Sequence, residues 1–148
     1  MMSIETQMNE TESIACWINR VARALASANT RAVAPHDLTS MQANLLMRMD
    51  LGMDSPSEIA TCLGIDASNL SRLIRGLEAA GFATREVDDN NRSRAILRLT
   101  RKGKDKAAAV HPDKRRMEES IVSGLTEAEI RNLLRILRKL SETCQTLT

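Results

Sequence analysis

The 148 residues include 21 Lys or Arg and 19 Asp or Glu, for a net charge of +2, with one Trp, one Phe and no Tyr. A chain of this length fits a single domain, and the shortage of aromatic residues favours a mainly helical fold. There is no apolar run of about 18 residues, the first ten residues are polar and acidic, and the three cysteines lie far apart. We therefore expect a cytoplasmic protein without a membrane span, secretion signal, disulfide framework or structural zinc.

Two helices are predicted in the first fifty residues. The first covers residues 11 to about 28, because apolar residues recur there every three or four positions. These residues are Ile14, Trp17, Val21, Leu25 and Ala28. Pro35 breaks the pattern. The second helix runs from Thr39 to about Asp50, since Thr39 and Gln42 have the spacing of a capping box, in which each side chain bonds the other residue's backbone N–H.

A helix-turn-helix motif is predicted next. A short helix is expected over residues 56–63, because Ser55, a following proline and Glu58 form a helix-start signal. After a turn that contains glycine, Asp66 caps a fourth helix over residues 67–80. Two short helices joined in this way are typical of the DNA-binding helix-turn-helix.

The remaining chain predicts a β-hairpin and two helices. Strand-like segments at 82–87 and 94–99 enclose a polar turn, which indicates a hairpin. Thr100 caps a helix to about residue 124, with a bend expected near Pro112. Thr126 and Glu129 form another capping box at the start of the last helix. Its apolar stripe consists of Ile130, Leu133, Leu134, Leu137 and Leu140.

The fourth predicted helix has a polar face suited to DNA. Its apolar residues Leu70, Leu73, Ile74 and Leu77 repeat at helical spacing, so the outward-facing residues are Ser68, Asn69, Ser71, Arg72 and Arg75. Asparagine can bond adenine N6 and N7, arginine can bond guanine O6 and N7, and serine can contact a base or a phosphate. Residues 66–106 contain ten Arg or Lys against six Asp or Glu, which fits a DNA-binding centre. We expect Ser68, Asn69 and Arg72 to face the bases and Arg75 to lie nearer the backbone, the alternative being a solvated charged face.

The order of these elements and three stretches of sequence resemble the MarR (multiple antibiotic resistance regulator) family of winged helix-turn-helix regulators. The stretches are L-T-S-M-Q at 38–42, S-E-I-A-T-C-L-G-I-D-A-S-N-L-S-R-L-I-R-G-L-E-A-A-G-F at 57–82 and L-T-R-K-G at 99–103. The resemblance implies one α+β domain over 1–148, in which residues 11–30 and 101–148 interlock two subunits and residues 39–100, with a wing at about 82–99, bind double-stranded DNA. It also implies a homodimer on a pseudo-palindromic operator, with recognition helices roughly 34 Å apart, and repression relieved by a small-molecule effector.

The wing departs from the family pattern. In the family, an arginine at the wing tip enters the minor groove and an aspartate two positions earlier holds it. The corresponding residues here are Asn91 and Ser93, with Arg92 and Arg94 on either side of the expected arginine position. Either arginine can serve if the hairpin is shifted by one residue, but such a shift turns the side chains to the opposite face, so the choice between the two stays open. A solvated basic loop is the alternative.

The resemblance leaves the mode of regulation open. Cys16 lies close to where the peroxide-sensing branch carries its reactive cysteine, and Arg20 one turn away can activate it, whereas its place beside the apolar stripe favours an inert thiol. The alternatives are thus a peroxide-responsive regulator, or a winged-helix interaction module or antirepressor that does not bind DNA. His36 and His111 are the only histidines, lie far apart in the chain and belong to no metal-binding or catalytic motif, so we expect no catalytic or metal site, no cofactor and no enzyme activity.

Overall fold

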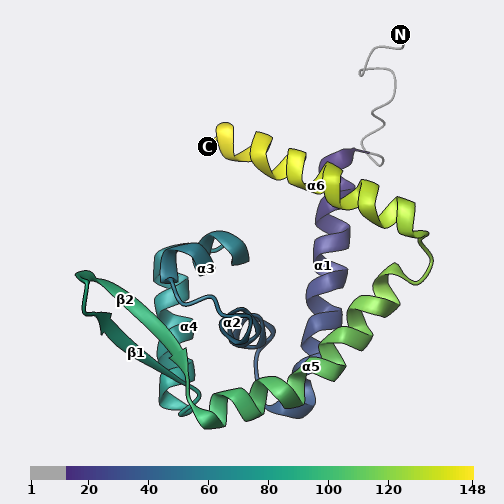
Figure 1. Cartoon of the computed structure of the whole chain (residues 1–148). Helices are drawn as coiled ribbons and strands as arrows, with labels where there is room; N and C mark the ends of the chain where they lie inside the picture. Colours follow the sequence, from purple (N-terminus) through teal and green to yellow (C-terminus); the bar gives the residue numbers. More distant parts are fainter. Residues whose placement is uncertain (1–12) are drawn as a thin grey trace. The chain divides into compact units, whose positions relative to one another are not determined.

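The computed structural model describes residues 13–148, and the chain divides into two compact units, residues 1–114 and 115–148 (Figure 1). A mainly helical chain with one antiparallel hairpin confirms the predicted fold class. The predicted helix start at Thr11 lies outside the described residues. Within residues 13–148, no helix is long and apolar enough to cross a membrane. The elements are α1 (Ile14–Val33), a 3-10 helix η3 (Ala34–His36), α2 (Ser40–Asp50), α3 (Pro56–Leu63), α4 (Ala67–Ala79), β1 (Ala83–Asp88), β2 (Asn91–Leu99), α5 (Arg101–Val122) and α6 (Glu127–Thr146).

Both predicted capping boxes form. At the start of α2, the Gln42 N–H donates to Thr39 Oγ1 at 3.2 Å and the Thr39 N–H donates to Gln42 Oε1 at 2.9 Å. Thr126 and Glu129 exchange the same pair of bonds at the start of α6. Each box satisfies N–H groups that the helix leaves without a partner, which fixes the residue at which the helix begins.

The helix-start signal predicted for α3 does not form a side-chain cap. Ser55 occupies the N-cap position, but its hydroxyl lies 3.1 Å from Ser57 Oγ and makes no bond to a backbone N–H. A second hydroxyl two positions along the chain competes for the capping side chain. Glu58 is exposed in the first turn, and α3 is held instead by Ile59, which is fully buried.

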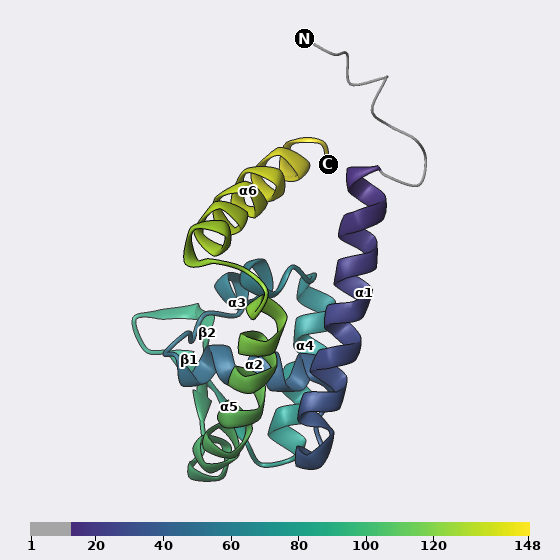
Figure 2. The same cartoon turned by 90° about the vertical axis from the view of Figure 1, so that its right-hand side faces the viewer.

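The larger hydrophobic core of the first unit lies between α2, α3, α4 and the hairpin. Helix α2 runs through the middle of this unit and contacts α1, α3, α4 and β2 (Figure 2). Each fully buried Leu or Ile in this core stabilises the fold by roughly 1.5–3 kcal/mol. The buried residues are Leu45, Leu46, Met49, Ile59, Leu70, Ile74, Leu77, Phe82, Ala83, Leu97 and Ala107.

Helix α1 continues to Val33, five residues beyond the predicted end near Ala28. The apolar pattern fades after Ala28, but no helix breaker occurs before Pro35, so the backbone hydrogen bonds continue. Val33 is fully buried in a smaller cluster with Ala43, Met47 and Val110, which holds the end of α1 and the middle of α5 against α2. Tertiary packing thus extends the helix beyond its own local signals.

Polar contacts of Lys114 and His36 join distant segments of the first unit. The Lys114 ammonium, 9% exposed, donates to Asn29 Oδ1 at 2.5 Å and to Asn44 Oδ1 at 2.8 Å, linking α5 to α1 and α2. His36 Nε2 lies 2.6 Å from Asp113 Oδ2. The carboxylate that contacts His36 is not that of the adjacent Asp37 but one that the fold brings from 77 positions away. The pair ties η3 to α5, and residues 13–148 contain no group of three or more side chains able to hold a metal ion.

The hairpin differs from its predicted boundaries. Strand β2 begins at Asn91, three residues earlier than expected, which shortens the polar turn to two residues. The pairing is regular from Ala83 opposite Leu99 to Val87 opposite Ala95, and the next pair joins Asp88 to Asn91. Residues 92–94 therefore form a bulge on β2, which the strand composition alone does not reveal.

The long helix α5 contains Pro112 and ends at Val122, two residues before the predicted end. Its first turn is capped as predicted, because the Gly103 N–H donates to Thr100 Oγ1 at 3.0 Å. Proline has no N–H to donate within the helix, so the expected bend stays a prediction based on that missing bond.

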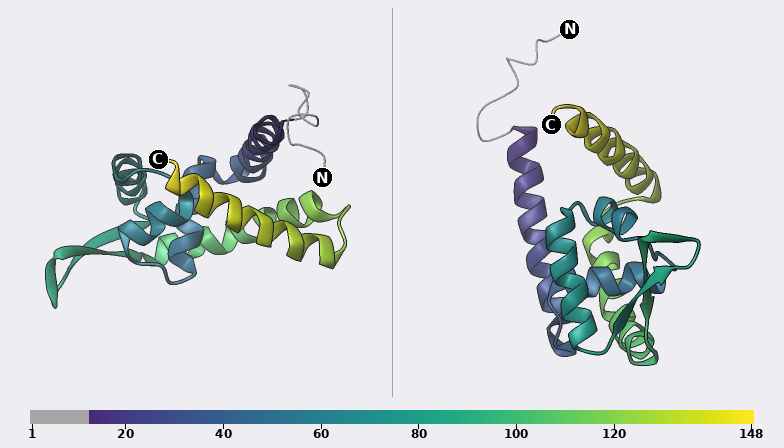
Figure 3. Two further views of the ribbon diagram at one scale, coloured as in Figure 1. Left: turned by 90° about the horizontal axis from the view of Figure 1, so that it is seen from above. Right: turned by 90° about the vertical axis from the view of Figure 1, so that its left-hand side faces the viewer.

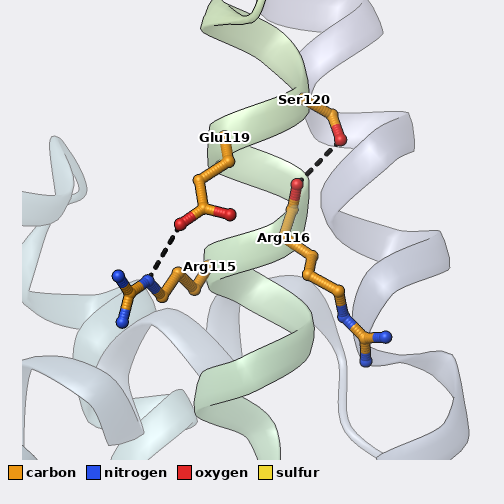
Figure 4. A network of polar contacts seen from close by, with 4 residues as sticks. All are labelled: Arg115, Arg116, Glu119 and Ser120. Atoms are coloured by element: carbon orange, nitrogen blue, oxygen red, sulfur yellow. Dashed lines mark hydrogen bonds and ion pairs between the residues drawn. The ribbon is translucent and has the colours of Figure 1, made fainter.

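In the second unit, the end of α5 and α6 carry ion pairs between residues four apart, such as Arg115 with Glu119 at 2.9 Å (Figure 4).

Candidate nucleic-acid interface

Helix α4 presents the polar face that its spacing predicts. Leu70, Ile74 and Leu77 are buried in the core and Leu73 is half-buried. On the other side, the side chains of four of the predicted DNA-contacting residues are exposed and the fifth is half-buried. The exposed ones are Ser68, Asn69, Arg72 and Arg75, and the half-buried one is Ser71. One short helix therefore gathers a set of hydrogen-bond donors and acceptors on a single surface.

The first turn of α4 is ordered by Asp66. Its Oδ1 accepts the Asn69 backbone N–H at 2.7 Å, which is the predicted N-cap bond. Its Oδ2 also accepts from Asn69 Nδ2 at 3.0 Å. The carboxylate thus holds both the backbone and the side chain of Asn69. The cap was predicted from the sequence, but the bond to the side chain was not.

The arginines of this region fall into two classes. Among residues 13–148, the guanidinium groups of Arg72, Arg75 and Arg92 have no carboxylate partner, whereas Arg94 pairs with Asp54 at 3.7 Å and Arg98 pairs with Glu86 at 3.0 Å. An exposed guanidinium without a carboxylate partner keeps its five donors available for a phosphate or a base. Arg72 and Arg75 on α4 and Arg92 on the hairpin, like the exposed Arg85 on β1, therefore keep their donors available for an anionic partner.

The hairpin projects outward from the first unit and carries a defined turn at its tip (Figure 3). Asn91 Oδ1 accepts from the Ser93 N–H at 3.2 Å and from Ser93 Oγ at 2.6 Å, and Asp88 Oδ1 accepts the Asn90 N–H at 2.9 Å. These are local side-chain bonds of the Asx-turn type. They hold Ser93 on Asn91, with Arg92 and Arg94 on either side within the bulge.

Arg94 is directed toward the base of the hairpin by Asp54. This aspartate, in the loop between α2 and α3, also accepts the Leu97 N–H through its backbone oxygen at 2.9 Å. The loop is thereby joined to β2 at two points. Nothing near Asp54 in the sequence indicates this role, because its partners lie about forty positions later in the chain.

The cysteines are all free thiols. Cys16 on α1 is half-buried and its backbone N–H bonds Ser13 Oγ at 3.1 Å. Arg20, the candidate activator of this thiol, lies with its guanidinium carbon 4.5 Å from the centre of the Trp17 ring. Cys62 and Cys144 are exposed.

Comparison with known proteins identifies relatives of this architecture. The model of the MarR family matches residues 36–92, which include α2, α3, α4 and most of the hairpin. The uncharacterized HTH-type transcriptional regulator YwaE of Bacillus subtilis is 25% identical over 147 residues, which cover 98% of this chain and 86% of the relative. The transcriptional repressor MprA of Escherichia coli is 34% identical over 85 residues, 57% of this chain and about half (48%) of MprA.

Solved structures share the same fold. A MarR family transcriptional regulator from Listeria monocytogenes, crystallised with a 26mer DNA, is similar with a TM-score of 0.80 and 27% identity, over 89% of each chain. The similarity therefore covers α1 and the C-terminal helices as well as the region matched by the family model.

Proposed function

We propose that the chain is a DNA-binding transcriptional regulator of the MarR family, which binds a pseudo-palindromic operator as a homodimer and represses transcription. The observation that carries the proposal is the exposed polar face of α4, on which two arginines have no carboxylate partner among residues 13–148. A helix of this kind fits the major groove of B-DNA, where base edges are distinguishable.

We propose that the N-terminal half of α4 contacts the base edges in the major groove. Ser68, Asn69 and Arg72 lie within the first two turns, and the recognition helices of helix-turn-helix proteins contact base edges with this end. Arg75 follows one turn later and contacts the phosphate backbone, while half-buried Ser71 supports the contact from the edge of the face. The roles are divided so that Arg72 reads guanine and Asn69 reads adenine.

We assign the minor-groove contact of the wing to Arg92. Its side chain is exposed and has no carboxylate partner within the described chain, whereas Arg94 is paired with Asp54. A narrow, A·T-rich minor groove attracts an unpaired guanidinium most strongly.

Replacing Arg92 with alanine is expected to lower operator affinity about tenfold, or about 1.4 kcal/mol, because both wings of the dimer lose their contact. Arg94→Ala is the matched control, with an expected loss of about threefold or less, since its charge is already shared with Asp54. Fluorescence anisotropy with a labelled operator duplex measures the affinity of each variant. A larger loss for Arg94→Ala than for Arg92→Ala would assign the groove contact to Arg94 instead.

Exposed apolar side chains on α1 and α6 support the dimer. On α1, Ile14, Trp17, Ile18, Val21 and Leu25 are 40–66% exposed, and on α6 Leu133, Leu134, Ile136 and Leu137 are 39–49% exposed. Folded monomers rarely leave such rows of large apolar groups in water. Sedimentation equilibrium at micromolar concentration is expected to give twice the chain mass of 16.4 kDa. A single-chain mass throughout this range would contradict the dimer.

Release of the operator is assigned to a small-molecule effector. Oxidation of Cys16 is the alternative, and a Cys16→Ser variant separates the two, because it abolishes a response to peroxide but leaves a response to an effector intact.

An alternative to DNA binding itself is a winged-helix interaction module without DNA affinity. The cytoplasmic location expected from the sequence stays a prediction.

Selection from randomised DNA tests the proposed function. Duplexes randomised over about two helical turns are incubated with the protein, and the bound fraction is amplified and sequenced. We expect an inverted repeat whose half-sites are about one helical turn apart. Recovery of sequences no different from the starting pool would favour the interaction module.

A further inference from the structure

We propose that Asp66 is a positioning residue that fixes which end of the Asn69 side-chain amide faces the DNA, and so sets the base pair that α4 reads at that position. The inference rests on the proposed function, because it requires α4 to lie in the major groove.

The geometry assigns two separate bonds to one carboxylate. Asp66 Oδ1 accepts the Asn69 backbone N–H at 2.7 Å, which alone is sufficient to cap the helix. Asp66 Oδ2 accepts from Asn69 Nδ2 at 3.0 Å and adds nothing to the cap. Because an ionised carboxylate only accepts hydrogen bonds, the nitrogen of the Asn69 amide must face Asp66. The amide therefore has one favoured orientation before any DNA is bound.

The outer edge of the amide then presents a defined pattern. The side-chain nitrogen has two hydrogens, of which Asp66 takes one, and Oδ1 has no hydrogen-bond partner among residues 13–148. One acceptor and one donor, in a fixed order, remain for the DNA. This pattern complements adenine, which offers N6–H as donor and N7 as acceptor, and it mismatches guanine, whose O6 and N7 both accept.

A fixed order also distinguishes the two strands. A freely rotating amide can match adenine on either strand by exchanging its oxygen and nitrogen, whereas an amide held by Asp66 matches only one arrangement. Holding the side chain in place also reduces the entropy that is lost on binding. Asp66 thus raises specificity at one base pair in each half-site without touching the DNA.

The test replaces Asp66 with asparagine and measures base preference. Asp66→Asn retains an oxygen for the helix cap but places an NH2 group where Oδ2 was. Because two NH2 groups repel, the Asn69 amide turns over and presents its nitrogen outward. We expect the preference for adenine over the other bases at one position of each half-site to fall by about fivefold or more. Competition binding with four duplexes that differ only at this position gives the preference as a ratio, which cancels the effect of the removed charge.

Two further variants separate positioning from capping. Asp66→Ser caps the helix through its hydroxyl but has no second oxygen, so we expect the same loss of preference with an unchanged melting temperature. In the Asn69→Ala background the preference is already lost, and adding Asp66→Asn is expected to change nothing further. If Asp66→Asn changes the base preference by the same factor in the presence and in the absence of Asn69, the proposal is overturned.

The outcomes distinguish this inference from the proposed function. If the wild-type protein selects an operator and Asp66→Asn retains the same preference at every position, the positioning role is overturned and DNA recognition stands. If the wild-type protein selects no sequence, the proposed function fails and the role of Asp66 fails with it.

Discussion

Replacing Gly103 with alanine is expected to lower the free energy of unfolding by about 3 kcal/mol, the upper range for inserting an atom into a filled space. A Cβ at Gly103 would lie 1.9 Å from the backbone oxygen of Phe82 and 2.9 Å from its carbonyl carbon. The Phe82 oxygen cannot move away easily, since it accepts the Thr100 N–H at 3.0 Å where β2 meets α5. The added methyl must therefore separate the start of α5 from the end of α4.

Thermal unfolding measures this effect, and Gly124→Ala provides the matched control. Among the described residues nothing lies within 4 Å of a Cβ at Gly124, so we expect the melting temperature of Gly124→Ala to stay close to that of the wild type. For Gly103→Ala we expect a fall of about 10 °C at equal protein concentration. If the two variants melt within a degree of each other, the close contact between Gly103 and Phe82 is not present in solution.

Replacing Arg72 with alanine is expected to weaken operator binding by about 2 kcal/mol or more, at least about 30-fold. An arginine that bonds guanine O6 and N7 contributes about 1–3 kcal/mol, and a two-fold symmetric complex loses that contribution twice. Arg72 is exposed and has no carboxylate partner within the described chain, so its removal breaks no internal ion pair and the fold should be unaffected.

Arg115→Ala is the control for charge alone. Arg115 lies outside the predicted DNA-binding region of residues 39–100, and its guanidinium is bonded to Glu119 at 2.9 Å (Figure 4). We expect less than about a twofold change in affinity, since exposed ion pairs contribute little. Comparable losses for Arg72→Ala and Arg115→Ala would indicate that net charge, and not the face of α4, determines binding.

Local signals in the sequence were sufficient for most of the helices. The capping boxes at Thr39 and Thr126 and the cap at Asp66 lie within three residues of the groups they bond, so their spacing is visible in the sequence. The outward face of α4 followed from the spacing of Leu70, Ile74 and Leu77. Helical periodicity thus identified the face of α4 that is exposed in the structure.

Features that depend on distant residues could not be predicted in the same way. The pairing of Arg94 with Asp54, and of His36 with Asp113, joins segments that only the folded chain brings together. The bulge at residues 92–94 arises from the pairing register of the two strands, which a strand's composition does not determine. For this reason the sequence left Arg92 and Arg94 as equal candidates, and the structure distinguishes them by their partners.

Anisotropy titration of the selected operator at several salt concentrations tests most directly whether the chain is a DNA-binding regulator that reads sequence through α4. We predict tight binding that weakens by about 10³-fold or more between 50 and 200 mM salt, together with much weaker binding to a scrambled duplex of the same composition. Equal affinity for both duplexes, or no binding at 50 mM salt, would contradict sequence-specific recognition by this protein.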